Sequence, residues 1–472
     1  MFVKRWSAPG GYREALAIGL PLVVSMASHM VMTTTDRIFL GNYSMDALAA
    51  ALPAGVMNFL FVSFFLGVVE YAAVFVAQYT GAGRPERVGA SLWQALWFCL
   101  PAYLILILFG LNSHILFELV GHASEVRELE EVYYSILCYG GGPYLIGVAL
   151  ACFFSGRGMT KPVMLVNLGG AILNVPLDYC LINGVGPFPE LGIRGAGIAT
   201  VGGFVFSALC FALLVFRKRN EKTFKVWSGW RFDPELFRRF LRFGLPGGVQ
   251  FFLDMFAVSF FVFMVGRIGT VELAASNIGM TLDNVAYLPM VGMSIAVSVM
   301  VGQAMGKKSP ESAAYATTSV LHIAWVYMGG VGVLLLVFPD FFIEIFRTRG
   351  MSDAEFAPIL ELGRVLLRYV AGFTLLDAVC IIHAGALKGA GDTRFIMWSI
   401  GLSSIFGMVL PLTLLYMAGY HSVHVPWACL YAYVVLLMCV LRYRYVKGPW
   451  RRMQVIEDEP SVPGERIDTA RP

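Results

Sequence analysis

Four aspartates lie inside long apolar stretches of this 472-residue sequence, where a charged side chain is unfavourable. They are Asp36, Asp178, Asp254 and Asp377. In a membrane-spanning helix a central aspartate costs roughly 2.5–3.5 kcal/mol, so each one indicates a function or a partner. Asn174 lies four residues before Asp178, which places the two side chains next to each other on one face of a helix. These five residues are therefore candidates for binding a cation or a proton.

Carboxylate and amide oxygens are ligands for hard cations, and a buried carboxylate can also take up and release a proton. We predict that Asp36, Asn174 and Asp178 form one ion-coupling cluster, and that the two later aspartates form a second. Coupling to H+ and coupling to Na+ both remain open. So does a structural role, in which an aspartate only pairs with a neighbour, as Asp36 would with Arg37.

A candidate substrate cavity follows from the same positions. His29 lies seven residues before Asp36, and Phe251, Phe252 and Phe373 lie about one helical turn from the later aspartates. The faces of aromatic rings attract organic cations, so these four residues are expected to line the cavity. Packing between helices remains the alternative for each of them.

The composition indicates which elements must position these side chains. Hydrophobic residues make up 58% of the sequence and charged residues 14%, whereas soluble domains carry about 25% charged residues. A helix needs about 20 apolar residues to cross a bilayer. The sequence predicts twelve such helices, at about 14–40, 47–79, 90–113, 131–154, 162–183, 195–216, 239–266, 272–304, 316–344, 363–387, 395–418 and 424–443. The expected fold is an all-α integral membrane protein with twelve transmembrane helices.

Other sites receive no support from the sequence. The eight cysteines are scattered singly, with no CxxC pair and no Cys/His cluster, so neither a disulfide framework nor a zinc site is expected. No cofactor is expected, and no metal beyond a coupling Na+. No HExxH or GxSxG motif lies on the spans, which disfavours an intramembrane enzyme. The net charge of +4 gives no indication of nucleic-acid binding.

The positions of Lys and Arg predict the topology. Roughly 27 of the 35 basic residues fall in the termini and in alternate connections between spans. Because basic residues are enriched in cytoplasmic connections, both termini are expected in the cytoplasm. An even number of spans is then required, and twelve satisfies this condition.

The two halves of the sequence repeat at an offset of 225 residues. This offset relates Pro21 to Pro246, Gly41 to Gly266, Gln78 to Gln303 and Gly81 to Gly306. Inverted or parallel repeats are typical of secondary transporters, in which one repeat rocks against the other. The two prolines lie inside the first helix of each half, where proline is expected to bend the helix.

The repeat predicts four regions in two pseudo-symmetric lobes of six helices. These regions are an N-lobe at 1–216, a basic cytoplasmic linker at 217–237, a C-lobe at 238–448 and a cytoplasmic tail at 449–472. The tail is rich in Pro, Asp, Glu and Arg, so it is expected to be disordered.

Several short motifs, in this order and spacing, resemble the multidrug and toxic compound extrusion (MATE) family over most of the chain. They lie at 19–41, 78–84, 155–162, 173–179, 186–192 and 195–200 in the first half, and at 243–246, 302–306 and 387–393 in the second. The resemblance implies two six-helix lobes around a V-shaped cleft. It also implies export of organic cations or other xenobiotics in exchange for H+ or Na+, by alternating access.

The resemblance assigns roles to individual residues. Asp36 corresponds to an aspartate of the family's first helix, Asn174 and Asp178 to a pair on its fifth helix, and Thr200 to a threonine on its sixth. The NorM-type subgroup also uses a glutamate on helix 7 and an aspartate on helix 10. Here Asp254 and Asp377 stand at those positions, and Phe373 stands where that subgroup has a tyrosine.

The resemblance further implies a monomer in a bacterial or archaeal plasma membrane, with small organic cations as substrates and the lipid bilayer as surroundings. Within the same superfamily the alternative is a flippase for lipid-linked precursors. An intramembrane enzyme is the alternative from a different class.

Overall fold

The computed structural model describes residues 2–120, 123–347 and 351–457, and this part of the chain is built from helices without any strand. Twelve helices or helix pairs within it are long and apolar enough to span a membrane, which confirms the predicted number. In the first half they are α2 (Tyr12–Tyr43), α3 (Met45–Val69) with α4 (Ala72–Gly81), α5 (Glu86–Leu111), α7 (Ser124–Ser155), α8 (Thr160–Asn183) and α9 (Ile193–Val215).

The second half repeats this series. Its spans are α11 (Pro234–Gly266), α12 (Thr270–Gly306), α13 (Pro310–Val337), α15 (Asp353–Ala390), α16 (Thr393–Ser404) continued by a π-helical turn and α17 (Leu410–Met417), and α18 (His424–Lys447). Short helices lie between or beside the spans: α1 (Phe2–Trp6), α6 (Ser113–Val120), α10 (Lys218–Phe224), α14 (Pro339–Glu344), and the 3-10 helices at Ser228–Trp230 and Pro449–Arg452.

Capping residues explain where two of the long helices begin. Asp233 accepts a hydrogen bond from the backbone N–H of Leu236 at 3.0 Å, and Pro234 occupies the first position of α11. Ser352 and Glu355 form a reciprocal capping box at the start of α15. Both arrangements satisfy N–H groups that the first turn of a helix leaves without a partner.

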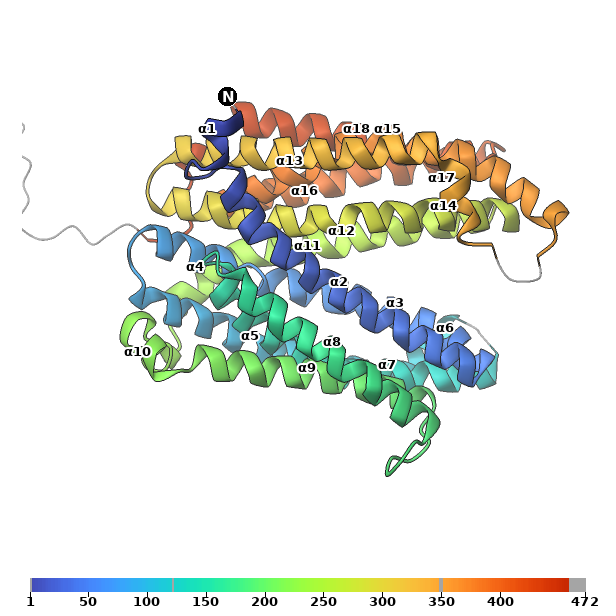
Figure 1. Ribbon diagram of the computed structural model, residues 1–472, viewed down its shortest axis with the longest axis horizontal. Helices are drawn as coiled ribbons and strands as arrows, with labels where there is room; N and C mark the ends of the chain where they lie inside the picture. The colour runs from blue at the N-terminus through green and yellow to red at the C-terminus, as the bar shows by residue number, and fades with distance from the viewer. Residues whose placement is uncertain (1, 121–122, 348–350, 458–472) are drawn as a thin grey trace, which may run out of the picture.

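The helices pack into two lobes with the same internal order. In the N-lobe, α2 packs on α8, and α7 packs on α3, α5 and α9. In the C-lobe the equivalent helices repeat these pairings, because α11 packs on α16, and α15 packs on α12, α13 and α18. Figure 1 shows the lobes as a blue-to-green group and a yellow-to-red group, with α11 between them. The predicted pair of pseudo-symmetric six-helix lobes is confirmed.

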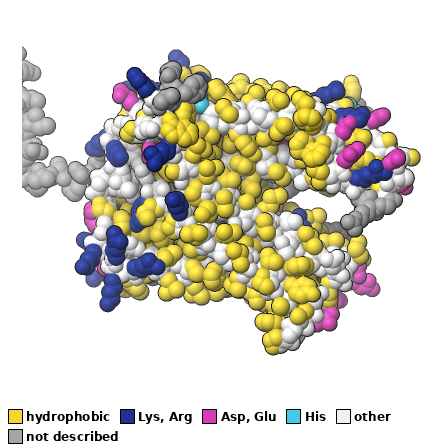
Figure 2. Space-filling model, in the orientation of Figure 1, with side chains coloured by type: hydrophobic (Ala, Val, Ile, Leu, Met, Phe, Trp, Pro, Cys, Tyr) yellow, Lys and Arg dark blue, Asp and Glu magenta, His cyan; other side chains and the backbone are white. Residues whose placement is uncertain are grey.

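The outer surface matches a lipid environment. Large apolar side chains such as Leu213 and Val326 are exposed on the spans. Figure 2 shows apolar side chains over the sides of the molecule, with charged side chains gathered at its two ends. We call the end with α1 and α10 the terminal end, and the end with α6 and α14 the far end. Figure 2 also shows a hollow between the lobes at the far end.

The lobes meet closely at the terminal end. A Cβ atom added to Gly81 would lie 2.0 Å from the carbonyl oxygen of Gln303, and one added to Gly306 would lie 2.1 Å from that of Gln78. Only glycine allows such an approach of two backbones. The two contacts are related by the repeat, so they lie on either side of the pseudo-twofold axis of the molecule.

The same two glutamines also join the lobes through their side chains. The Gln78 amide donates to the carbonyl oxygen of Gly389 at 3.0 Å, and the Gln303 amide donates to that of Gly156 at 3.1 Å. Each bond runs from one lobe to the other, and the two acceptors also occupy matching places in the repeat. We call these residues the glutamine pair. They keep the lobes together at the terminal end.

The structure differs from the expected disordered tail over residues 449–457. Val455 and Ile456 are buried, and the backbone N–H of Val455 donates to the Gln78 side chain at 3.0 Å. Glu457 pairs with Arg84 at 2.8 Å and with Arg87 at 3.2 Å, both on the N-lobe. The apolar Val455 and Ile456, followed directly by the charged Glu457, let this short segment fill the seam between the lobes. Residues 458–472 of the predicted tail lie outside the described residues.

Candidate functional site

A buried polar cluster lies inside the N-lobe, where α2, α8 and α9 pack together. Asp36 is on α2, Asn174 and Asp178 are on α8, and Thr200 is on α9. Their exposed fractions are 3%, 0%, 0% and 5%. The Thr200 hydroxyl donates to a carboxylate oxygen of Asp36 at 2.8 Å. The structure therefore brings together all four residues of the first predicted cluster.

Most of the polar atoms in this cluster have no hydrogen-bond partner of normal geometry among the described residues. These atoms are Oδ1 of Asp36, both carboxylate oxygens of Asp178, and both side-chain atoms of the Asn174 amide. The Asp36 and Asp178 carboxylates are close enough to interact directly. Buried polar atoms without partners are rare in folded proteins and indicate a missing ligand, water or proton. Two adjacent carboxylates repel each other when both are ionised, so a cation or a proton between them is stabilising.

The surroundings of the cluster are mainly aromatic. His29 packs against Tyr144 and Phe204, with ring centroids 5.9 Å apart in both cases. It is also within electrostatic range of Asp36. Arg37 lies within the same range, but the described residues show no salt bridge between it and Asp36. The simple ion-pair alternative for Asp36 therefore gains no support from the contacts.

A second acidic group lies in the C-lobe and is less enclosed. Asp254 on α11 and Asp377 on α15 are both partly exposed and interact electrostatically. Asp283 on α12, also partly exposed, acts on Asp377 as well. Gln250 is the hydrogen-bond neighbour of Asp254. Among the described residues, no group of His, Cys, Asp or Glu side chains has an arrangement that could hold a metal ion.

Asp283 is a member of this group that the sequence analysis missed. It lies inside α12, which was predicted as a span, so the cost of a buried aspartate applies to it as to the other four. Tyr287, one helical turn later, is within range of all three C-lobe aspartates. The repeat offset relates Asp283 to Asn58, so both halves carry a polar side chain at this position.

The structure separates the four predicted cavity residues. Phe251 packs edge to face on Phe59 of the N-lobe, with ring centroids 5.9 Å apart, and therefore lies where the lobes meet. Phe252 is partly exposed on the same helix. Phe373 is buried and faces Tyr431 inside the C-lobe. His29 lies in the N-lobe, so no shared lining of the four side chains is visible in the described part of the chain.

The prolines expected to bend helices lie inside their helices. Pro21 is in α2 and Pro246 is in α11, and both side chains are buried at positions related by the repeat. Each helix continues through its proline. Asp36 and Asp254 follow these prolines on the same helices, so a change of helix direction at the proline would move the carboxylate.

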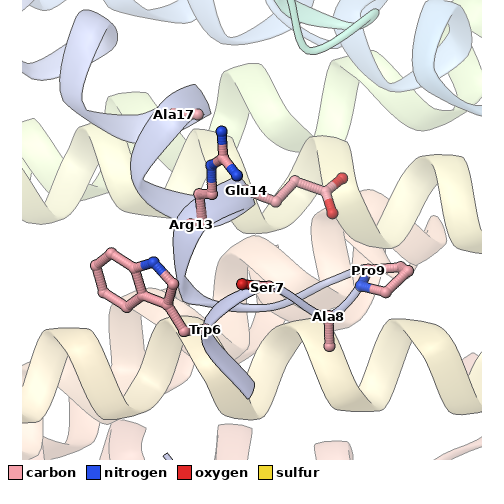
Figure 3. A pocket seen from close by; sticks show the side chains of 7 residues that line it. All are labelled: Trp6, Ser7, Ala8, Pro9, Arg13, Glu14 and Ala17. Atoms are coloured by element: carbon pink, nitrogen blue, oxygen red, sulfur yellow. The ribbon is translucent and has the colours of Figure 1, made fainter. Parts of the chain in front are cut away.

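Two hollows at the terminal end are distinct from these clusters. Figure 3 shows the first, of about 360 Å³, lined by side chains that include Trp6, Arg13 and Glu14. The second, of about 300 Å³, lies between Gly81 and Gly306, on the seam between the lobes. Neither is lined by a candidate ion-coupling residue.

The fold and the site define a helical membrane protein of two repeated lobes, with acidic side chains held inside each lobe. The MatE family model matches residues 21–180 and 246–413, more than half of the chain, so the chain belongs to the MatE family. It is therefore a membrane transporter and not an enzyme, as the motifs predicted.

Individual relatives agree with this assignment. A probable multidrug resistance protein NorM of Bradyrhizobium diazoefficiens is 31% identical over 387 residues, which cover 81% of each chain. One of Brucella suis is 28% identical over 407 residues, which cover 84% of each chain. Among solved structures, the eukaryotic MATE transporter AtDTX14 matches with a TM-score of 0.81 at 16% identity, over 93% of this chain and 96% of that one. This structural match supports the fold.

Proposed function

We propose that this protein is a secondary active exporter that moves organic cations and similar xenobiotics out of the cell in exchange for H+ or Na+. The names of its relatives, multidrug resistance proteins of the NorM type, support the substrate class. The acidic character of both intramembrane clusters also supports a cationic substrate, because a carboxylate in a low-dielectric environment favours a positively charged partner.

The observation that carries the proposal is the set of buried polar atoms without partners on Asp36, Asn174 and Asp178. Together with Thr200 they offer carboxylate, amide and hydroxyl oxygens, which suit Na+. The two neighbouring carboxylates are equally suited to sharing a proton. In either case the ion neutralises the cluster, so the packing of α2 against α8 and α9 differs between the loaded and the empty state.

Alternating access follows from the two lobes. The glutamine pair closes the terminal end, while the hollow between the lobes opens at the far end (Figure 2). We infer that ion binding in the N-lobe, transmitted through α2 and Pro21, favours one orientation of the lobes. The partly exposed Asp254, Asp283 and Asp377 would attract the cationic substrate or form a second ion site in the C-lobe.

The proposal includes a location and an orientation. The relatives are bacterial, which supports a multi-pass protein of the bacterial plasma membrane. The distribution of Lys and Arg supports cytoplasmic termini, so the terminal end faces the cytoplasm and the hollow faces outward. In this orientation the N-lobe (1–216) and the C-lobe (238–448) act as the two moving parts of a monomer, joined by the linker at 217–237.

Dye efflux from proteoliposomes tests the proposal. Ethidium is loaded into vesicles that contain the reconstituted protein, and a pH gradient and a sodium gradient are imposed separately. We expect efflux against the dye gradient under one of the two imposed ion gradients. The gradient that drives efflux identifies the coupling ion. Equal efflux with and without both gradients would exclude a coupled exporter.

A further inference from the structure

The connection between the two lobes carries an unusual excess of positive charge. Residues 217–242 contain nine basic and three acidic side chains. All three acids have structural partners: Glu221 accepts hydrogen bonds from the linker backbone and from Ser228, Asp233 caps α11, and Glu235 pairs with the next turn of α11. The acids therefore leave most of the basic side chains without a counter-ion.

Six of these basic side chains are exposed and make no salt bridge within the described residues. They are Arg217, Lys218, Arg219, Lys222, Lys225 and Arg231. Exposed aromatic side chains stand among them: Trp227 is 55% exposed, Trp230 56% and Phe232 51%. We call these nine residues the linker surface. A cluster of cations beside exposed indole rings is typical of contact with lipid headgroups.

The aromatic part of the linker surface is held in place by hydrogen bonds. The indole N–H of Trp227 donates to the carbonyl oxygen of Phe216 at 3.0 Å, and that of Trp97 donates to the carbonyl oxygen of Trp230 at 3.0 Å. Because its indole N–H is bonded internally, Trp227 exposes mainly the apolar part of its ring, and the bond from Trp97 fixes the backbone of Trp230. Their exposure is therefore a fixed feature of the fold.

The position of the linker surface places it beside the bilayer. It begins directly after α9 ends at Val215 and finishes before α11 begins at Pro234, so both ends are attached to spans. Figure 1 shows α10 at the terminal end, on the outer side of the N-lobe. Figure 2 shows Lys and Arg side chains gathered at that corner of the molecule, next to apolar side chains.

The linker is also packed firmly on the N-lobe. A Cβ atom on Gly89 of α5 would lie 2.4 Å from the carbonyl oxygen of Lys225, and one on Gly229 would lie 2.8 Å from the backbone nitrogen of Ala90. The indole N–H of Trp93 donates to the carbonyl oxygen of Val226 at 2.6 Å. A ligand held by the linker surface is therefore held against the N-lobe as well.

We propose that the linker surface is a binding site for anionic phospholipid headgroups of the adjoining leaflet. The cations contact the phosphate groups, while Trp227, Trp230 and Phe232 lie at the level of the glycerol and upper acyl chains. Because the linker is packed on α5, bound lipid anchors the N-lobe at the membrane surface.

Native mass spectrometry of the full chain, released from mixed phosphatidylglycerol and phosphatidylcholine bilayers, tests this inference. The wild type is expected to retain phosphatidylglycerol preferentially. A triple variant with Lys218→Gln, Arg219→Gln and Lys222→Gln should lose this preference roughly tenfold or more, since each cation near a membrane surface contributes to anionic-lipid binding.

The matched control neutralises three exposed cations at the other end of the spans, with Arg194→Gln, Arg267→Gln and Arg368→Gln. It should retain phosphatidylglycerol like the wild type. Equal retention by the linker variant and the wild type would overturn the inference, and so would equal loss in both triple variants. Release of the bound lipid by millimolar glycerol phosphate would also overturn it, since a site for free phosphate would not need the bilayer.

A second readout tests the aromatic contact. Brominated phosphatidylglycerol should quench tryptophan fluorescence more strongly than brominated phosphatidylcholine, and the double variant Trp227→Phe/Trp230→Phe should remove most of the difference. An unchanged difference in this variant would place the lipid elsewhere. Thermal unfolding of each variant establishes that the surface substitutions leave the fold intact.

Discussion

Asp36 differs from the other intramembrane carboxylates because it is both buried and partly satisfied. Its Oδ2 accepts the hydrogen bond from Thr200, while its Oδ1 has no partner among the described residues. The bond from Thr200 thus fixes the orientation of the carboxylate, and Asp178 lies close enough to interact with it. Such a fixed, half-satisfied group can bind an ion without first reorganising its surroundings.

Replacement of Asp36 by asparagine should reduce ion-driven efflux by at least tenfold, because the amide keeps the shape but cannot carry the exchangeable charge. Initial rates of dye efflux from proteoliposomes measure the effect. Asp46→Asn, at an exposed position near the start of α3, is the matched control and should transport like the wild type. Undiminished ion-driven efflux by the Asp36 variant would contradict the coupling role.

Glu457 allows a prediction of pH dependence outside the membrane spans. Burial raises the pKa of this carboxyl group, but the hydrogen bond from Tyr79 and the charges of Arg87 and Arg84 outweigh burial and lower the pKa below its ordinary value of 4.5. The contact therefore stabilises the fold fully above about pH 4.5, and this contribution is lost as the pH falls through the lowered pKa.

Glu457→Gln should cost about 1 kcal/mol of unfolding free energy at neutral pH, and this difference from the wild type should vanish in acid. Thermal or denaturant unfolding in detergent, followed from pH 7 to pH 3, measures it. Glu344→Gln, at an exposed position without a salt bridge in the described residues, should show no such difference. A difference that stays constant over the whole range would show that the charge of Glu457 is not responsible.

The sequence predicted most of the candidate site at this scale. The cost of charge in a membrane singles out Asp36, Asp178, Asp254 and Asp377, and the structure gathers the first two with Asn174 and Thr200. Asp283 obeys the same rule, since it lies inside the predicted span at 272–304, so the cost of an intramembrane charge was the signal for it as well. The interior packing of Phe373 could not be predicted, since which face of α15 meets α18 depends on the tertiary arrangement.

At the scale of helices, the most informative contact is the glutamine pair between α4, α12, α7 and α15. Each glutamine amide donates a hydrogen bond to a backbone carbonyl oxygen of the other lobe. The side-chain oxygen of Gln78 also accepts a hydrogen bond from the backbone N–H of Val455. Transport by rocking requires these bonds to break whenever the terminal end opens.

The double variant Gln78→Leu/Gln303→Leu should therefore favour the state that is open at the terminal end. Each lost hydrogen bond is worth about 1 kcal/mol, so a shift of ~2 kcal/mol, or roughly 30-fold in population, is expected. Spin labels at the exposed positions Glu86 and Arg394, in a cysteine-free background, report the distance between the lobes.

The control for this prediction is Gln94→Leu. Gln94 is also fully buried, but its amide bonds stay within α5 and the linker. The label distance should be unchanged in this variant. If both variants gave the wild-type distance distribution, the glutamine pair would have no role in closing the terminal end.

The sequence did not predict that two of the spans are interrupted along their length. The span at 47–79 was predicted as one helix, whereas the structure ends α3 at Val69 and begins α4 at Ala72. The span at 395–418 contains a π-helical turn at Ile405–Val409. Pro411 lies two residues after the π-helical turn and has no N–H to donate to the carbonyl oxygen of Gly407, and Gly407 also approaches the backbone of Tyr433 closely.

At the scale of the whole molecule, the pseudo-twofold axis passes between two glycines. Gly81 and Gly306 each face the carbonyl oxygen of the other lobe's glutamine. The approach is tight at the terminal end, and the hollow between the lobes lies at the far end (Figure 2). The repeat in the sequence predicted the two lobes. It could not predict which end is closed, because a molecule closed at the terminal end and one closed at the far end contain the same helices.

Gly81→Ala should prevent this close approach, since the new Cβ would lie 2.0 Å from the Gln303 carbonyl oxygen. We expect a longer distance between the labels at Glu86 and Arg394 and at least a tenfold loss of transport. Gly330→Ala is the control, because a Cβ atom there would meet nothing within 4 Å. A wild-type distance and rate in the Gly81 variant would mean that the lobes do not need this contact.

The docking of residues 455–457 has a consequence for biosynthesis. This segment follows all twelve spans in the sequence, so it is made after them and can dock only once the rest of both lobes has been made. Until then Gln78 lacks the donor that Val455 provides, and Arg84 lacks Glu457. The N-lobe, which is made first, therefore has an incomplete contact surface until residues 455–457 dock on it, so the closed seam requires a segment that is made later than both lobes.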